Sequence, residues 1–87
     1  MGRKLKKFEM NLSLLLAILR KEELEDSVCI DFSNICYSPG VIGMTMKENN
    51  YIVYEIDEFG VYNETLSTSK ENEACLGLLN SLGIVFD

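Results

Sequence analysis

The feature that most constrains this chain is the stretch YIVYEIDEFGVYNETL at residues 51–66. Apolar and polar side chains alternate in its first half, which is typical of a β-strand with one buried face. The next four residues, Asp57-Glu58-Phe59-Gly60, are typical of a tight turn. A second strand is predicted to follow the turn, as far as Leu66. The stretch therefore predicts a β-hairpin, which the rest of the chain has to cover.

The two faces of the first of these strands differ in chemistry. One face is apolar and predicts contact with a core; it carries Ile52, Tyr54 and Ile56. The opposite face adds carboxylates to an aromatic ring; it carries Tyr51, Val53, Glu55 and Asp57. Because antiparallel sheets tolerate one face in water, we expect the second face to stay open and acidic. Such a face is a scaffold for binding.

The N-terminal region predicts a helix from about residue 5 to residue 25. Apolar side chains recur there at helical spacing, at Phe8, Leu12, Leu15, Leu16 and Leu19. A second apolar stripe lies on a neighbouring face, at Met10, Leu14, Ala17 and Ile18. A helix that is apolar on two sides is either well buried or in contact with a partner. Both alternatives stay open from the sequence.

Two further strands are predicted between this helix and the hairpin. The first begins after Asp26-Ser27 and alternates through Val28, Ile30 and Phe32 towards residue 37. The turn Ser38-Pro39-Gly40 separates it from the second, which spans about residues 41–47. The three residues 48–50 then predict the turn into the strand that begins at Tyr51. All four strands would be neighbours in sequence and antiparallel.

The C-terminal region predicts a second helix. Thr68 is the expected N-cap, and Glu71 completes a capping box three residues later. The buried stripe is Cys75, Leu78, Leu79 and Leu82, and Gly83 is the expected C-terminal cap. The apolar tail at residues 84–86 is expected to pack against the body.

These elements predict a single α+β domain over residues 1–87. Its order is α-β-β-β-β-α, with a four-stranded antiparallel meander sheet and both helices packed on one face. The residues expected to hold that face against the helices are Ile30, Ile42, Met44, Ile52, Tyr54 and Ile56.

The charge of the chain favours a basic partner and disfavours nucleic acid. The net charge is −6, and four of the eight basic residues lie at positions 3–7. Residues 8–87 therefore hold 14 acidic and four basic residues. An acidic body repels phosphate backbones and attracts a basic protein. We expect no direct contact with nucleic acid.

The residue inventory also disfavours catalysis. The chain contains no histidine, so it cannot build a Cys/His pair or a Ser/His/Asp triad. Cys29, Cys36 and Cys75 lack metal spacing and are interpreted as reduced packing thiols, with a Cys29–Cys36 disulfide as the open alternative. We expect a non-enzymatic protein with no cofactor and no metal.

The N-terminal region does not predict a membrane or export segment. The apolar run at residues 12–19 is too short to span a bilayer, which takes about 20 apolar residues. Charged residues follow the run directly, and no small-x-small cleavage site lies nearby. We expect a cytoplasmic protein without a membrane contact.

The candidate binding residues are carboxylates and tyrosines of the predicted hairpin, together with one carboxylate from the first strand. They are Asp31, Tyr51, Glu55, Asp57, Glu58, Tyr62 and Glu64. Aromatic residues are enriched at the centres of protein interfaces, and carboxylates there would match a basic partner. The alternative is that these side chains form an ordinary solvated face.

The C-terminal half also resembles a known family. The run Val53-Tyr54-Glu55-Ile56-Asp57-Glu58-Phe59-Gly60, then Asn63, Ser69, Glu71-Asn72-Glu73-Ala74-Cys75 and Leu79, resembles small immunity proteins of bacterial polymorphic-toxin and contact-dependent growth inhibition systems. The resemblance covers about residues 51–80. Phe59 stands where such proteins often carry arginine, so a contact made by that arginine does not carry over.

The resemblance implies a cytoplasmic protein that binds and neutralises one cognate toxin domain, often a nuclease, by occluding its active or substrate-binding site. It assigns no individual binding residue, because these differ between members. The alternative function is a non-enzymatic adaptor or structural domain that self-associates through the first helix.

Overall fold

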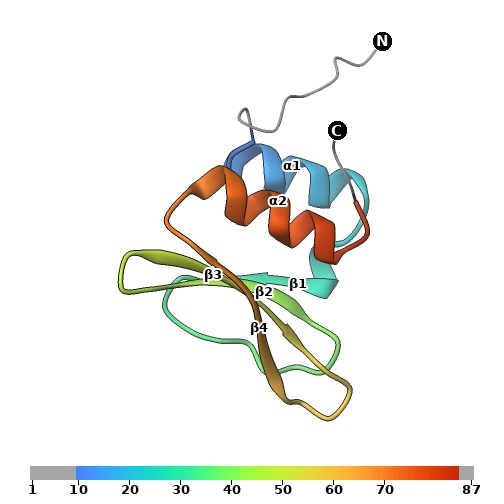
Figure 1. Cartoon of the computed structure of the whole chain (residues 1–87). Coiled ribbons are helices and arrows are strands. Elements are labelled where there is room, and N and C mark those ends of the chain that lie inside the picture. Colours follow the sequence, from blue (N-terminus) through green and yellow to red (C-terminus); the bar gives the residue numbers. More distant parts are fainter. Residues whose placement is uncertain (1–9, 85–87) are drawn as a thin grey trace.

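A computed structural model describes residues 10–84 and shows an α+β fold with both helices on one face of a four-stranded sheet (Figure 1). The elements are α1 (Leu12–Lys21), the short 3₁₀ turn η2 (Glu25–Ser27), β1 (Val28–Ile30), β2 (Ile42–Lys47), β3 (Asn50–Ile56), β4 (Tyr62–Thr68) and α2 (Glu71–Ser81). The predicted fold class and the placement of both helices on one face are confirmed.

The sheet is mixed, so the predicted antiparallel meander is wrong at its first strand. The strand order is β1-β2-β3-β4, and β1 runs parallel to β2. β1 ends at Ile30 because the Asp31 carboxylate accepts hydrogen bonds from the backbone N–H groups of Ser33 (2.9 Å) and Asn34 (3.2 Å). This local turn directs the chain out of the sheet. Residues 31–41, here called the crossover segment, then return to the start of β2.

The register points the side chains of the central strand β3 to the opposite faces of the sheet from those predicted. The turn between β2 and β3 has two residues, so Lys47 pairs with Asn50 and Met44 pairs with Val53. The predicted turn had three residues, and a shift of one residue exchanges the two faces of a strand. The side chain that faces the helices is therefore Val53, which is fully buried, and not Tyr54.

The main core lies between this face of the sheet and the helices. It contains residues of β2, β3 and both helices, together with one residue just before α1: Met10, Leu15, Leu19, Met44, Val53, Ala74, Cys75, Leu78 and Leu79. Within α1, Leu15 and Leu19 are buried, whereas Leu16 is 49% exposed. The helix therefore buries one face only: Leu12, Leu14 and Ile18 are half-buried, whereas Leu16 and Ala17 are exposed. A partner contact at the exposed positions stays open as the alternative to a well-buried helix. The helix is also shorter than the predicted residues 5–25, because Asn11 is its N-cap and it ends at Lys21; residues 5–9 lie outside the described residues.

The second face of the sheet is covered by the crossover segment, so the predicted open acidic face is wrong. Ile52, Tyr54 and Ile56 point to this side, and all three are buried. The Tyr54 ring lies across Gly43, where an added Cβ would come within 2.2 Å of Tyr54 Cζ. The Tyr54 hydroxyl accepts a hydrogen bond of 3.0 Å from the backbone N–H of Cys36. The glycine therefore makes room for a ring that anchors the segment.

Helix α2 begins later than predicted. Its N-cap position is Lys70, and the Thr68 hydroxyl instead accepts a hydrogen bond from the Lys70 N–H and lies 2.7 Å from Glu73 Oε1. Glu71 does not close a capping box. Its Oε2 accepts the backbone N–H of Leu12 at 2.8 Å, so it links the starts of the two helices. A carboxylate at this place also interacts favourably with the positive end of the α1 dipole.

Both helices end in the same way. In α2, the Ile84 N–H bonds to the Leu79 carbonyl while Gly83 adopts φ +87°, which is the arrangement of a Schellman motif. The predicted cap at Gly83 is therefore confirmed, and Ile84 packs against the core. The rest of the predicted apolar tail lies outside the described residues. In α1, the equivalent left-handed position is held by Glu23 at φ 57°.

Candidate functional site

The candidate site is built on the turn that joins β3 to β4, residues 57–61, here called the hairpin tip. Asp57 organises it: its Oδ1 accepts the backbone N–H groups of Phe59 (2.8 Å) and Val61 (2.9 Å). The Gly60 N–H also bonds to the Asp57 carbonyl at 3.0 Å, and Gly60 adopts φ +81°. The tip is therefore a fixed structure held by one carboxylate, and Asp57 is engaged in holding it.

This turn presents apolar side chains to solvent. Phe59 is 81% exposed and Val61 is 53% exposed. The backbone of the crossover segment passes beside the tip at Tyr37, whose side chain is 58% exposed: a Cβ on Gly60 would be 4.0 Å from the Tyr37 carbonyl oxygen. Single exposed apolar residues are normal, but a contiguous group of them marks an interaction surface. The fold gives no other use for a phenylalanine at this position.

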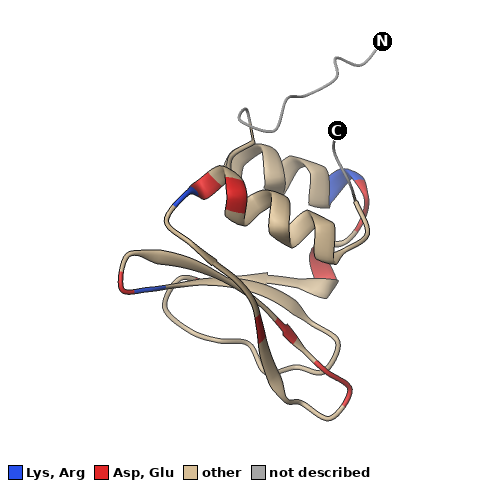
Figure 2. Ribbon diagram, in the orientation of Figure 1, with Lys and Arg blue, Asp and Glu red and all other residues tan. Residues whose placement is uncertain are grey.

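Uncompensated negative charge surrounds these apolar side chains. Glu55, Glu58 and Glu64 are exposed at the same end of the hairpin, and no lysine or arginine occurs between Lys47 and Lys70. The described ion pairs lie elsewhere, between Arg20 and Glu25 and between Lys70 and Glu73. Figure 2 shows acidic residues also at the helix ends and at the β2–β3 turn, but basic residues accompany those groups and are absent from the hairpin tip.

The structure gathers only part of the predicted binding set. Glu55, Asp57, Glu58 and Glu64 belong to the β3–β4 hairpin near its tip. Tyr62 begins β4 directly after the tip, but its ring packs against Tyr54, and Asp31 and Tyr51 lie elsewhere.

Each of these three has a structural role. Hydrogen bonding from the Ser33 backbone N–H lowers the pKa of Asp31, which caps the turn after β1. Tyr51 lies on the helix-covered face with its hydroxyl 3.4 Å from Glu71 Oε1, and partial burial raises its pKa. The Tyr62 ring packs 5.1 Å from that of Tyr54, and desolvation and then the charge of Glu64 raise the pKa of Tyr62.

Sequence reasoning missed the apolar half of the site. Phe59 was interpreted only as a turn residue, and Val61 and Tyr37 were assigned to strands. The available signal was a phenylalanine flanked by Glu58 and Gly60 inside a turn, where the chain offers no core for it. Tyr37 could not be found in this way, because its place beside the tip depends on the path of the crossover segment.

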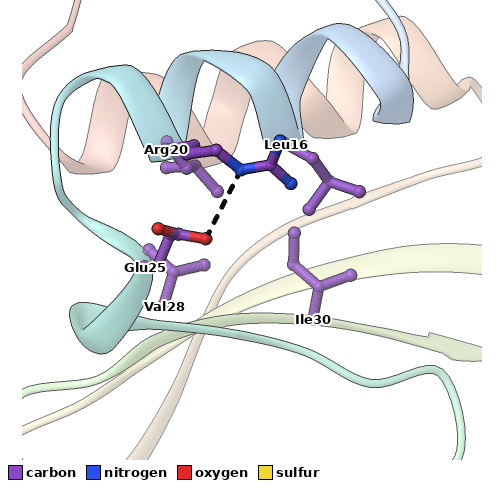
Figure 3. A pocket seen from close by; sticks show the side chains of 6 residues that line it. Leu16, Arg20, Glu25, Val28 and Ile30 are labelled. Carbon is purple, nitrogen blue, oxygen red and sulfur yellow. Dashed lines mark ion pairs between the residues drawn. The ribbon is translucent and has the colours of Figure 1, made fainter.

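Two of the hollows that residues 10–84 form lie away from the tip itself. One, of about 320 Å³, lies under the crossover segment and is lined in part by Tyr37, Tyr62 and Glu64. The other, of about 220 Å³, lies between α1 and β1. Figure 3 shows Leu16, Val28 and Ile30 around this second hollow, with the Arg20–Glu25 ion pair of 3.9 Å at its side.

Residues 10–84 contain no group of three or more His, Cys, Asp or Glu side chains placed to hold a metal ion. None of the described helices has the length and apolar character that crossing a bilayer requires.

Comparison with known proteins adds no relative: no protein-family model, curated protein or solved structure matches the chain.

Proposed function

We propose that this chain is a non-enzymatic binding protein whose hairpin tip contacts a basic protein partner. The observation that carries the proposal is the exposed Phe59 at the end of a rigid turn, with apolar neighbours and a surround of carboxylates that have no cation beside them. An apolar centre with a charged rim is the common anatomy of a protein interface.

The two parts of the tip would contribute differently to binding. The apolar centre supplies affinity, since an anchor residue that is fully desolvated in a complex is worth about 2 kcal/mol or more. The carboxylates supply steering, because complementary charge raises the association rate and excludes acidic competitors. Asp57 contributes indirectly, because it fixes the turn before the partner arrives and so reduces the entropy lost on binding.

Within this class, we propose that the partner is a toxin domain and that the chain is its immunity protein. The support is the resemblance over residues 51–80, which spans the hairpin tip and the start of α2, together with the net charge of −6. Nuclease domains carry basic surfaces because they hold phosphate backbones. An acidic tip with an aromatic anchor would occupy such a surface and exclude the substrate.

The proposal predicts that the gene immediately upstream encodes an exoprotein with a basic C-terminal domain, and it is tested with that domain and the full chain. We expect an equimolar amount of the chain to abolish nuclease cleavage by that domain. Phe59→Ala should restore cleavage, whereas Leu16→Ala, a truncation of another exposed apolar residue on the opposite side of the molecule, should not. Unaltered cleavage with the wild-type chain in excess would contradict the toxin-inhibitor function.

A second candidate function is self-association through α1. It is favoured by the half-exposed Leu16 beside the apolar hollow formed with Val28 and Ile30 (Figure 3). Light scattering over a wide concentration range distinguishes the two candidates. A dimer that dissociates on Leu16→Asp supports self-association, and a monomer at every concentration excludes it.

A further inference from the structure

The side chains of Cys29, Cys36 and Tyr54 converge on the face of the sheet that the crossover segment covers. Cys29 of β1 pairs with Gly43 of β2, and Gly43 pairs with Tyr54 of β3, so the three residues form one row across the sheet. Because Gly43 has no side chain, the Tyr54 ring extends over it towards β1; an added Cβ there would lie 2.4 Å from the Tyr54 hydroxyl oxygen. The Tyr54 hydroxyl therefore lies towards Cys29, at the β1 end of this row.

The same hydroxyl fixes the position of Cys36. It accepts the Cys36 backbone N–H at 3.0 Å, and the Cys36 sulfur lies 3.9 Å from Ser38 Oγ. Cys36 is therefore held over the row that begins at Cys29, although seven positions separate the two residues in sequence. Both cysteines are free and only partly buried.

We propose that Cys29 and Cys36 are a thiol pair that a hydroperoxide converts into an intramolecular disulfide, which closes the crossover segment onto β1. The proposal stands on the placement of both thiols beside one tyrosine hydroxyl and does not depend on the function proposed for the hairpin tip.

The two thiols differ in a way that assigns their roles. The Ser38 backbone N–H lowers the pKa of Cys36, and the Cys29 thiol lowers it further. Burial raises the pKa of Cys29, and the neighbouring Cys36 raises it further. Since the thiolate is the nucleophile in thiol chemistry, Cys36 is the residue that reacts first and Cys29 is the residue that resolves the product.

The chemistry balances with the hydroperoxide as the oxidant. The Cys36 thiolate attacks one peroxide oxygen, the O–O bond breaks, and the products are a sulfenic acid on Cys36 and one hydroxide or alkoxide. The Cys29 sulfur then attacks the Cys36 sulfur, the S–O bond breaks, and the oxygen leaves as water with the Cys29 proton. The protein loses two electrons, which reduce the peroxide. Exchange with a thiol such as glutathione reverses the bond.

Cys75 supplies an internal control. Its side chain is fully buried between the helices and the sheet, and burial raises its pKa to about 12. It lies on the opposite face from the pair and is expected to react last with any oxidant or alkylating agent.

The disulfide would also affect the hairpin tip. Tyr37, which follows Cys36 directly, forms part of the exposed apolar group beside Gly60. Joining Cys36 to β1 restricts the backbone next to that ring.

The test treats the reduced full chain with increasing hydrogen peroxide and follows it by mass spectrometry after tryptic digestion. Residues 22–47 form one peptide with both paired cysteines, and residues 71–87 form another with Cys75. We expect the first peptide to lose the mass of two hydrogen atoms, in monomeric protein, before Cys75 changes. A first peptide that keeps both thiols free after Cys75 has been oxidised, or a disulfide between two molecules, would overturn the proposal.

Two variants separate chemistry from fold. Cys29→Ser should stop disulfide formation and leave a sulfenic acid on Cys36 that a dimedone probe traps. Tyr54→Phe keeps the ring over Gly43 but removes the hydroxyl that positions Cys36, so disulfide formation should slow several-fold while the circular dichroism spectrum is unchanged. Disulfide formation at the wild-type rate in a folded Tyr54→Phe variant would show that the tyrosine has no positioning role and would remove the geometric basis of the pair.

Discussion

The two hairpins that share β3 differ at their turns. The β2–β3 turn consists of Glu48 and Asn49 alone, both at positive φ (51° and 68°), and it presents no large apolar side chain. The β3–β4 turn is longer, is held by Asp57 and carries the exposed Phe59. The first turn is the shortest connection that the strand twist allows. The second uses more residues than a connection requires.

This difference indicates which of the two turns has features that folding alone does not require. Holding Glu48 at positive φ costs about 1 kcal/mol. This turn exposes no large apolar side chain that could bind a partner. At the other turn, hydrogen bonds from two backbone N–H groups to one carboxylate hold a shape whose exposed side chains serve no packing role. The β2–β3 turn is therefore a simple connection, whereas the β3–β4 turn presents the proposed binding surface. The following experiments test this contrast.

The largest expected effect is on partner affinity. Reversing Glu55→Lys and Glu58→Lys together should weaken binding of a basic partner by about 3 kcal/mol or more, because close charge pairs across interfaces couple by roughly 1.5–7 kcal/mol. A calorimetric titration at low and high salt measures the change, and the variant should lose most of the salt dependence.

The matched control is the double reversal Glu22→Lys with Asp26→Lys, which makes the same change in net charge at exposed positions far from the tip. An equal loss of affinity in this control would show that net charge, and not the tip, governs binding.

The next effect is on stability. Asp57→Ala should lower the free energy of unfolding by about 2 kcal/mol, since it removes a charged acceptor from two backbone N–H groups. Urea denaturation measures this. Glu58→Ala is the neighbouring control, with an exposed side chain and an expected change within about 0.5 kcal/mol. Equal midpoints for the two variants would mean that the tip is not held by Asp57.

A smaller effect of opposite sign is expected at the other hairpin. Replacing Glu48-Asn49 by Asn-Gly should raise the free energy of unfolding by about 1 kcal/mol, because both residues then tolerate positive φ. Partner affinity should not change. A loss of affinity in this stabilised variant would assign function to the wrong turn.

Particular residues show how far the sequence predicts this molecule. The strands of both hairpins, α2 and the cap at Gly83 follow from alternation, helical spacing and glycine chemistry. The face of β3 was predicted wrongly because it depends on whether Asn50 belongs to the turn or to the strand. The direction of β1 was missed because the Asp31 cap, a local hydrogen-bonding choice, ends the strand early.

The candidate site, too, is only partly predictable from the sequence. Its carboxylates are evident from the sequence, since Glu55, Glu58 and Glu64 have no basic neighbour along the chain. Its apolar centre is less evident, because the exposure of Phe59 depends on the shape of the turn that Asp57 holds. Tyr37 reaches the tip only through tertiary contacts of the crossover segment.

The smallest expected effect concerns pH and the other carboxylate that caps a turn, Asp31. The Ser33 backbone N–H lowers its pKa below the ordinary value of 3.8. The stability it contributes is therefore complete above 3.8 and is lost as pH falls through the lower value in the folded state. Asp31→Asn should make the acid side of the stability profile shallower in urea unfolding at stepped pH. Parallel profiles for the variant and the wild type would contradict this role.

The most direct test of the central claim compares both turns in one experiment. Amide hydrogen exchange of the full chain is measured with and without the proposed partner, a basic toxin domain. Binding at the hairpin tip predicts slowed exchange at residues 57–64 and beside Tyr37, with no change at residues 47–50. Slowed exchange at the β2–β3 turn or around Leu16, with residues 57–64 unaffected, would contradict it.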